Sequence, residues 1–206
     1  MNDSADYFSF FILPRKLVLD AAALEKQFYA FSRKLHPDRF AGRPAQEQEL
    51  ALAQSSLLND AYRTLKDPVA RTEYLLKLEG IELEEQSRAA TDASNAAGTQ
   101  KKQLVPPDLL EEVFELNMQL EEMRGAKSRG EDDPQLKRDL ASAKQNFDSQ
   151  LAQLQIQLEA LWTAWDKAFS ANDTQAKDAA KAKMVDLLNR RSYIRNLVRD
   201  VNEVLS

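Results

Sequence analysis

Apolar and polar residues follow one another along the first part of the chain with the period of an α-helix. Asp20 can cap a helix N-terminus, and the apolar residues after it recur every three or four positions. These residues are Leu24, Phe28, Phe31 and Leu35. The pattern predicts one amphipathic helix over residues 21–35.

The same period returns over residues 46–67, after which Pro68 can open a shorter helix that Gly80 caps. Residues 37–46, between the two longer helices, contain two prolines and a glycine, which interrupt a helix. So short a loop predicts an antiparallel hairpin, and the aromatic segment YFSFFILP ahead of it can seal its base. The apolar positions of the second helix are Leu50, Ala53, Leu57, Ala61 and Leu65.

The second half of the chain has three further helical patterns behind a polar segment. Residues 84–106 lose the apolar period and are small and polar, which is typical of a linker. Helices are predicted from Pro107 to the loop GAKSRGEDDP, from about Gln135, and from about Asp173. Their heptad-like spacing and short connections predict an antiparallel three-helix bundle or coiled coil. The expected all-α fold, without a sheet, has a first domain over 1–83, a linker over 84–106 and a helical bundle over 107–206.

Composition and charge narrow the functions that the chain can have. Its 206 residues carry a net charge of −5, so a broad nucleic-acid surface, which needs a basic excess, is not expected. The lack of cysteine removes disulfides, thiolate nucleophiles and sulfur-based metal sites, and we expect neither a metal nor a cofactor. The N-terminus is acidic where a signal peptide would be basic, and no apolar run approaches the roughly 18 residues of a membrane span. We therefore expect a cytoplasmic protein.

The one histidine of the chain, His36, lies in the sequence KLHPDRF. Catalysis would need a nucleophile and an oxyanion site, and neither a phosphate-binding loop nor an esterase-type elbow occurs, so we do not expect an enzyme. A structural role as a helix C-cap stays open. Pro37, however, fixes its own φ and pushes His36 into an extended conformation, which favours a rigid tip that displays His36 and Asp38.

Basic residues surround this tip in an otherwise acidic chain. They are Lys26, Arg33, Lys34, Arg39 and Arg43. A local basic patch suits docking onto an acidic protein surface, because charge complementarity steers the encounter and fixes the orientation. The alternative is an ordinary solvated helix face.

The helix after Pro107 carries one apolar stripe more than a bundle needs. Its seam consists of Leu109, Val113, Leu116, Leu120 and Met123. A second stripe, rotated away from that seam, consists of Leu110, Phe114 and Met118, edged by Glu111, Glu115 and Glu122. The second stripe could pack under the first domain or form an exposed docking surface with an acidic rim, and the sequence leaves both open.

Several segments together resemble one known family. A helix ending in HPD, a loop, and a helix running into NDAYRTLKDP are similar to the J-domain of chaperone co-factors. YFSFFILP, YAFSRKLHPDRF, NDAYRTLKDPVARTEYLLKLEG and the C-terminal three-helix region resemble the HscB family of iron-sulfur cluster assembly co-chaperones. The resemblance covers most of the chain and implies an N-terminal J-domain followed by a C-terminal helical bundle.

The resemblance implies a first partner, a DnaK/HscA-type ATPase chaperone. In the family, residues at the positions of His36, Pro37 and Asp38 engage this chaperone and stimulate its ATP hydrolysis. The basic residues implied in the same contact are Arg33, Lys34, Arg39 and Lys26. The chain itself would carry no ATP site.

A second implied partner is the IscU-type scaffold protein on which the iron-sulfur cluster is assembled. The C-terminal helices would bind this scaffold and deliver it to the chaperone, which aids maturation of iron-sulfur proteins. The residues at the scaffold-contacting positions are Leu110, Phe114, Glu115, Met118 and Glu122, with Tyr193 of the last helix opposite them. Met118 stands where the family commonly has a glutamate.

The chain departs from the family in two places, and two other readings stay open. Ile12 replaces the glycine that usually precedes Leu13 and Pro14, and the linker is longer than usual. A general J-domain co-chaperone with a different client, or a coiled-coil structural protein whose tail dimerises, would also fit the residues. We expect a monomer without nucleic-acid or membrane partners, although the heptads leave self-association open.

Overall fold

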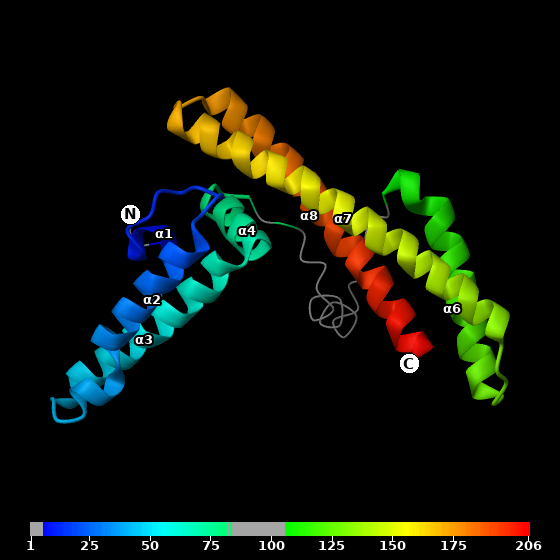
Figure 1. Cartoon of the computed structure of the whole chain (residues 1–206), viewed down its shortest axis with the longest axis horizontal. Coiled ribbons are helices and arrows are strands. Elements are labelled where there is room, and N and C mark those ends of the chain that lie inside the picture. Colours follow the sequence, from blue (N-terminus) through cyan, green and yellow to red (C-terminus); the bar gives the residue numbers. More distant parts are fainter. Residues whose placement is uncertain (1–5, 82, 84–105) are drawn as a thin grey trace. The chain divides into compact units, whose positions relative to one another are not determined.

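The computed structural model describes residues 6–81, 83 and 106–206, and every regular element in these ranges is a helix (Figure 1). The all-α fold expected from the sequence is confirmed, since these ranges contain no strand. In chain order the elements are α1 (Tyr7–Phe10), α2 (Ala21–Leu35), the 3-10 turn Pro37–Phe40, α3 (Ala45–Lys66), α4 (Pro68–Leu78), the 3-10 turn Pro107–Leu109, α6 (Leu110–Ser128), α7 (Pro134–Ser170) and α8 (Thr174–Leu205).

Contacts within the chain group its residues into two units. The first unit comprises Met1–Leu83 and Leu161–Lys181, and the second comprises Glu84–Ala160 and Ala182–Ser206. The end of α7 and the start of α8 therefore belong with the first unit. The linker expected from the sequence lies, apart from Pro106, outside the described residues, and the domain limits stay a prediction.

The helices of the first unit begin and end at the residues that the sequence indicates. Asp20 accepts hydrogen bonds from two amides in the first turn of α2, and Asp67 does the same for α4. Pro68 occupies the first position of α4, where its missing N–H has no consequence. Gly80 follows α4 with a φ of 79°, a left-handed conformation that a residue without a Cβ adopts readily.

Aromatic side chains close the base of the α2–α3 hairpin, as the sequence predicts. Phe8 and Phe11 are fully buried, and the Phe11 ring packs against Phe31 of α2 with the centroids 5.9 Å apart. Tyr7 stacks on Tyr74 of α4 at 4.4 Å, and its N–H donates to the Tyr74 hydroxyl at 2.9 Å. The short helix α1 thus links α2 to α4.

A buried arginine holds the segment between α1 and α2. Arg71 Nε and Nη2 donate to the Leu17 carbonyl at 3.0 and 2.6 Å, and its Nη1 donates to the Leu65 carbonyl. Burial lowers the pKa of the Arg71 guanidinium, while the carboxylates of Asp166 and Asp67 oppose that shift. The guanidinium thus supplies N–H donors to buried carbonyls that lack a backbone donor from a helix or a sheet.

The end of α7 completes the first unit by binding the same segment. Asp166 accepts the N–H groups of Leu17 and Val18 at 2.7 and 2.9 Å. Trp165 is buried, and its indole N–H donates to the Arg15 carbonyl at 3.0 Å. The helical period places Trp165 on the apolar seam of α7, but it does not reveal that this end of the seam packs in the first unit.

Helix α3 buries a face that differs from the one its apolar spacing suggests. Ala61 and Leu65 are buried as expected, together with Leu58. Leu50 and Leu57 instead have 59% and 37% of their surface exposed. Near the hairpin tip, apolar spacing therefore does not mark the packed side of α3.

The second unit is a three-helix core built by α6, α7 and α8. The buried members of this core are Leu109, Val113, Leu116, Leu120, Met123, Leu136, Leu140, Phe147, Leu154, Tyr193, Ile194, Leu197, Val201 and Val204. Helix α6 continues through Gly125 to Ser128, into the first four residues of the loop predicted to end it, and Ala126 there is buried. The burial of Ala126 outweighs the cost of placing Gly125 in a helix, which is about 1 kcal/mol relative to alanine.

Candidate docking sites

The HPD turn, which we define as residues 36–40, joins the end of α2 to the loop before α3. His36 is extended, with φ −60° and ψ 125°, as the following proline requires. Pro37 then opens a 3-10 turn in which the Arg39 N–H donates to the His36 carbonyl at 3.0 Å. The helix therefore stops at His36, and the chain direction changes within one turn.

Within the turn, the imidazole of His36 caps the backbone and stays accessible. Nδ1 accepts the Asp38 N–H at 3.3 Å, which leaves the proton of a neutral ring on Nε2. The same Nδ1 lies 3.5 Å from the Asp38 carboxylate, and the two side chains are 55% and 88% exposed. His36 thus stands at the C-cap position of α2, but its ring caps the 3-10 turn that follows, and its side chain is displayed at the same time.

The basic shoulder of the turn, defined as Lys26, Arg33, Lys34 and Arg39, is exposed along its whole length. Two of its members also bond to the backbone of α2. Arg33 Nε donates to the Tyr29 carbonyl at 3.3 Å, and Arg39 Nη1 donates to the Arg33 carbonyl at 3.1 Å. Cations at the end of α2 are favourable there because the carbonyl end of a helix carries partial negative charge.

One contact of this region was missed in the sequence. Gln48, in the first turn of α3, donates through Nε2 to the carbonyls of Ala41 and Arg43 at 3.3 and 2.8 Å. A glutamine near a helix start is the only sequence signal, and that position is too common to single it out.

The second candidate site is the exposed stripe of α6, which consists of Leu110, Phe114 and Met118. These residues have 54%, 68% and 60% of their surface exposed, while the opposite seam of the same helix is buried. Large apolar side chains rarely gather on open surface without a partner. Within the second unit the stripe lies on the surface and outside the three-helix core, which fits both readings left open by the sequence.

Acidic residues flank the exposed stripe, whereas Tyr193 does not lie on it. Glu115 and Glu122 are exposed on α6 beside the stripe. Tyr193 is only 6% exposed, belongs to the core of the second unit, and has its pKa raised by burial. The structure brings the α6 residues together on one surface and places Tyr193 inside the bundle, so its role in docking stays a prediction.

Tyr193 lines a groove of about 810 Å³ at the start of α6. Asp108 and Arg190 form an ion pair of 2.7 Å in this groove, and the Arg190 hydrogen bond lowers the pKa of Asp108. Glu112 accepts the side-chain amide of Gln150 at 3.2 Å across it. None of the three stripe residues lines the groove. Its polar contacts fix α6 against α7 and α8 and thereby orient the exposed stripe.

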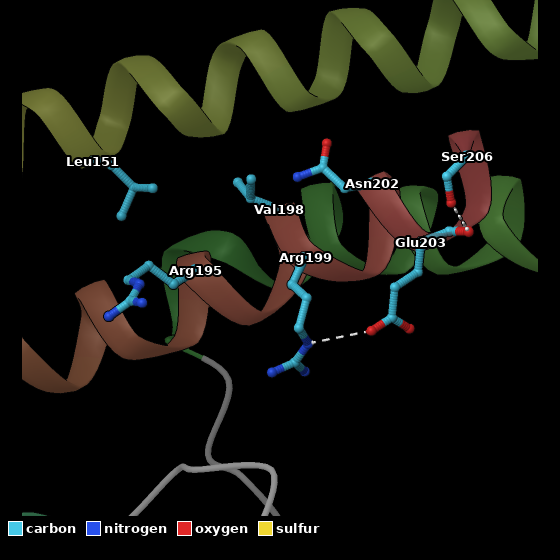
Figure 2. Close-up of a pocket in the computed structure, with 7 residues that line it drawn as sticks. All are labelled: Leu151, Arg195, Val198, Arg199, Asn202, Glu203 and Ser206. Carbon is cyan, nitrogen blue, oxygen red and sulfur yellow. Dashed lines mark hydrogen bonds and ion pairs between the residues drawn. The ribbon is translucent and has the colours of Figure 1, made fainter.

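A second cavity, of about 490 Å³, lies beside the last turns of α8 (Figure 2). Figure 2 shows Arg199 directed at Glu203, with Nε 3.8 Å from the carboxylate, and Arg199 also bonds Asp200 at 3.2 Å. These carboxylates pair with Arg199, and Arg195 also lines the cavity. No residue expected at a docking site lines it.

Metal binding and membrane insertion were the two other functions considered for the described ranges. In residues 6–81, 83 and 106–206, no group of three or more His, Asp or Glu side chains could hold a metal ion. Within the same part of the chain, no helix combines the length and the apolar character that a bilayer crossing requires. What these surfaces offer is recognition by charge at the HPD turn and by apolar contact at the exposed stripe.

Comparison with known proteins finds similarity to one group of co-chaperones. No family model matches the chain. Two curated proteins of Vibrio cholerae serotype O1, from strains O395 and N16961, are named "Co-chaperone protein HscB homolog" and are each 38% identical over 116 residues, or 56% of this chain. Over this stretch the chain is similar to the HscB co-chaperones. It spans 60% of the length of these two HscB relatives.

Solved HscB structures extend the likeness over nearly the whole fold. "Chaperone HscB from Vibrio cholerae" matches with a TM-score of 0.60 and 26% identity, covering 97% of this chain and 96% of that one. The human co-chaperone HscB matches with a TM-score of 0.58 over 98% of this chain and 83% of its own, and at 23% identity it supports the fold alone. These structures therefore support the fold expected from the sequence, a J-domain followed by a C-terminal helical bundle.

Proposed function

We propose that this chain is a co-chaperone of iron-sulfur cluster assembly. Its HPD turn and basic shoulder would engage a DnaK/HscA-type ATPase chaperone and stimulate its ATP hydrolysis. Its exposed stripe on α6, with Glu115 and Glu122, would bind an IscU-type scaffold protein and so bring it to the chaperone. The chain would act as an adaptor, and the catalysis would be that of its partner.

The observation that carries the first half of this proposal is the exposed, rigid HPD turn. His36 and Asp38 are accessible on a turn that Pro37 stiffens, and the exposed cations Arg33, Lys34 and Arg39 lie close to them in the chain. Such a surface suits an acidic partner, because charge steers association and fixes the orientation of the complex.

Replacing His36 tests this half directly. His36→Gln should abolish the stimulation of chaperone ATPase while the helical circular dichroism stays unchanged. Arg63→Gln, an exposed basic position on α3 outside the shoulder, is the control and should keep full stimulation. Stimulation that survives His36→Gln would remove the chaperone contact from this turn.

The second half rests on the exposed stripe, whose apolar side chains serve no purpose in the bundle core. We expect Leu110→Ala combined with Phe114→Ala to weaken scaffold binding by at least about a hundredfold in calorimetric titration, since truncation of anchor residues costs about 2 kcal/mol or more each. Ile156→Ala, which truncates an equally exposed residue of α7, is the matched control. Equal weakening by both variants would rule out the stripe as a specific site.

Three further parts of the proposal come from the sequence and the resemblance. The scaffold site would lie in a domain over 107–206, joined by residues 84–106 to a J-domain over 1–83. The protein would act as a monomer, and sedimentation at several concentrations checks this. A cytoplasmic location stays a prediction.

A further inference from the structure

We propose that Gln48 is a positioning residue that holds the HPD turn in its binding-ready conformation. The proposal rests on the proposed function, because it assumes that this turn engages the chaperone. Gln48 would not touch the partner; it would act through the backbone of the turn.

The first observation is the pair of hydrogen bonds that Gln48 makes. Its amide nitrogen donates to the Arg43 carbonyl at 2.8 Å and to the Ala41 carbonyl at 3.3 Å. Both donors of one side-chain amide are thus used on the loop that leads from the turn into α3. The backbone N–H groups of Glu47 and Gln48 also bond the Pro44 carbonyl at the start of α3, but among the hydrogen bonds described for α3 only the Gln48 side chain reaches the carbonyls of Ala41 and Arg43.

From these two residues the bonding continues into the turn itself. The Ala41 N–H donates to the Asp38 carbonyl at 3.4 Å, and the Arg43 N–H donates to the Phe40 carbonyl at 2.9 Å. Asp38 in turn donates its N–H to the ring of His36. A chain of hydrogen bonds therefore runs from α3 through Gln48 to both polar residues of the tip.

The opposite side of the turn is fixed to α2 by the Arg39 guanidinium, which donates to the Arg33 carbonyl. With Gln48, this gives the turn one side-chain anchor on each helix of the hairpin. If the Gln48 side chain is lost, the turn keeps its anchor on α2 but loses its side-chain anchor on α3. We therefore expect a looser turn and not an unfolded hairpin.

Packing supports the turn only in part. None of residues 36–44 is buried, and only Pro37 and Phe40 are half-buried, so the loop after the turn depends on its hydrogen bonds. Fixing the backbone of one residue costs about 1–2 kcal/mol of conformational entropy. A turn that is already ordered avoids that cost at the moment of binding, which is what preorganisation means for affinity.

A substitution of Gln48 should differ in its effect from a substitution of a residue that contacts the partner. A loosened turn adopts the binding conformation only part of the time. The apparent affinity for the chaperone is then the intrinsic affinity multiplied by the fraction of molecules in that conformation. Once bound, the turn makes the same contacts as before. We expect the half-saturating concentration to rise and the maximal stimulation to stay the same, whereas His36→Gln should remove the maximum.

Gln48→Glu is the sharpest variant, because it keeps the size of the side chain and removes both donors. Its carboxylate would face two carbonyl oxygens. Gln46→Glu is the matched control, since it adds the same charge in the same exposed turn of α3 without removing a bond to the loop. Gln48→Lys restores an N–H donor at the position and should recover part of the lost affinity.

Two measurements decide the proposal. Hydrogen exchange of the full chain should speed up at the amides of Arg39, Ala41 and Arg43 in Gln48→Glu, and not in Gln46→Glu. In ATPase titrations with a DnaK/HscA-type chaperone, the half-saturating concentration of Gln48→Glu should rise about three- to tenfold, the value of one or two hydrogen bonds, at unchanged maximum.

Other results would overturn it. Unchanged exchange in the turn, an equal effect of Gln46→Glu, or a lowered maximum at unchanged half-saturation would each exclude a positioning role. Should the unaltered protein fail to stimulate the chaperone, the proposed function would fall, and the exchange measurement would still decide whether Gln48 orders the turn.

Discussion

The two ends of the α2–α3 hairpin are built in opposite ways. At the base, Phe8 and Phe11 are fully buried and Arg71 is nearly so, and side chains satisfy the backbone carbonyls enclosed there. At the tip, His36 and Asp38 are exposed, and hydrogen bonds on the surface hold the backbone. One end keeps polar groups away from water, and the other presents them to it.

This difference separates stability from recognition along one helix pair. Burial and the satisfaction of buried polar groups determine the free energy of unfolding, so changes at the base should destabilise the fold. Exposed side chains contribute little to that free energy, so changes at the tip should affect only binding. The following substitutions test this division, from the largest expected effect on stability to the smallest.

Arg71→Met should be the most destabilising. The methionine keeps most of the apolar volume but leaves the buried carbonyls of Leu17 and Leu65 without their donors. We expect the free energy of unfolding to fall by about 2–4 kcal/mol, measured by urea denaturation. Arg63→Met, which removes an exposed arginine paired with Asp60, should cost less than about 0.5 kcal/mol. Equal losses would mean that burial does not set the value of the guanidinium.

Asp6→Asn should give a smaller loss that depends on pH. Burial alone would raise the pKa of Asp6, but the Ser9 N–H and the Arg15 guanidinium outweigh it, and the net shift is downward. A carboxyl with a depressed pKa in the folded state stabilises it above the ordinary pKa of about 4, and this stabilisation disappears as the pH falls through the folded value.

At pH 7 the Asp6→Asn protein should therefore be about 1 kcal/mol less stable than the unaltered protein. The two unfolding curves should converge in denaturation experiments taken from pH 7 down to pH 3. A gap that stays constant over this range would show that the charge of Asp6 is not the source of the stabilisation.

The sequence predicts some features of the molecule and misses others, and the difference depends on how far apart in the chain the contacting residues lie. The caps Asp20 and Asp67 and the buried and exposed stripes of α6 could be predicted, because they depend on neighbours one or two helical turns away. The display of His36 could be predicted for the same reason, since Pro37 is its neighbour. Local rules fix all of these features.

The features that the sequence did not reveal depend on residues far apart in the chain. In the sequence Arg71 looks like any surface arginine, and only the structure shows that it bonds the Leu17 carbonyl. Asp166, in the distant helix α7, likewise accepts the Leu17 N–H. Leu50 shows the opposite error, since this regular apolar position of α3 is exposed while Ala51 beside it is buried. Periodicity marks which side chains can be buried, and only tertiary contacts decide which are.

Ile12→Gly should raise stability, which makes it the exception at the base. Ile12 has a φ of 55° and is 82% exposed, so a β-branched residue holds a left-handed conformation without burial to compensate. Glycine, the residue usual here in the family that the sequence resembles, removes the strain but loses entropy on folding. We expect a net gain of about 0.5–1 kcal/mol in urea denaturation. Val18→Gly, an exposed position without positive φ, should instead lose a similar amount.

Asp38→Ala should have the smallest effect on the fold, and its comparison with Asp20→Ala tests the division within α2 itself. Asp20 caps the start of this helix at the base, and removing such a cap costs about 1 kcal/mol. Asp38, just beyond the other end, is 88% exposed, and its loss should change the free energy of unfolding by less than about 0.5 kcal/mol. In ATPase assays with the chaperone the order should reverse, since Asp38→Ala would remove a contact residue and Asp20→Ala would not. If Asp38→Ala lowered the free energy of unfolding as much as Asp20→Ala, the tip would support the fold. Recognition and stability would then not be separated even at Asp38, the residue expected to show the separation best.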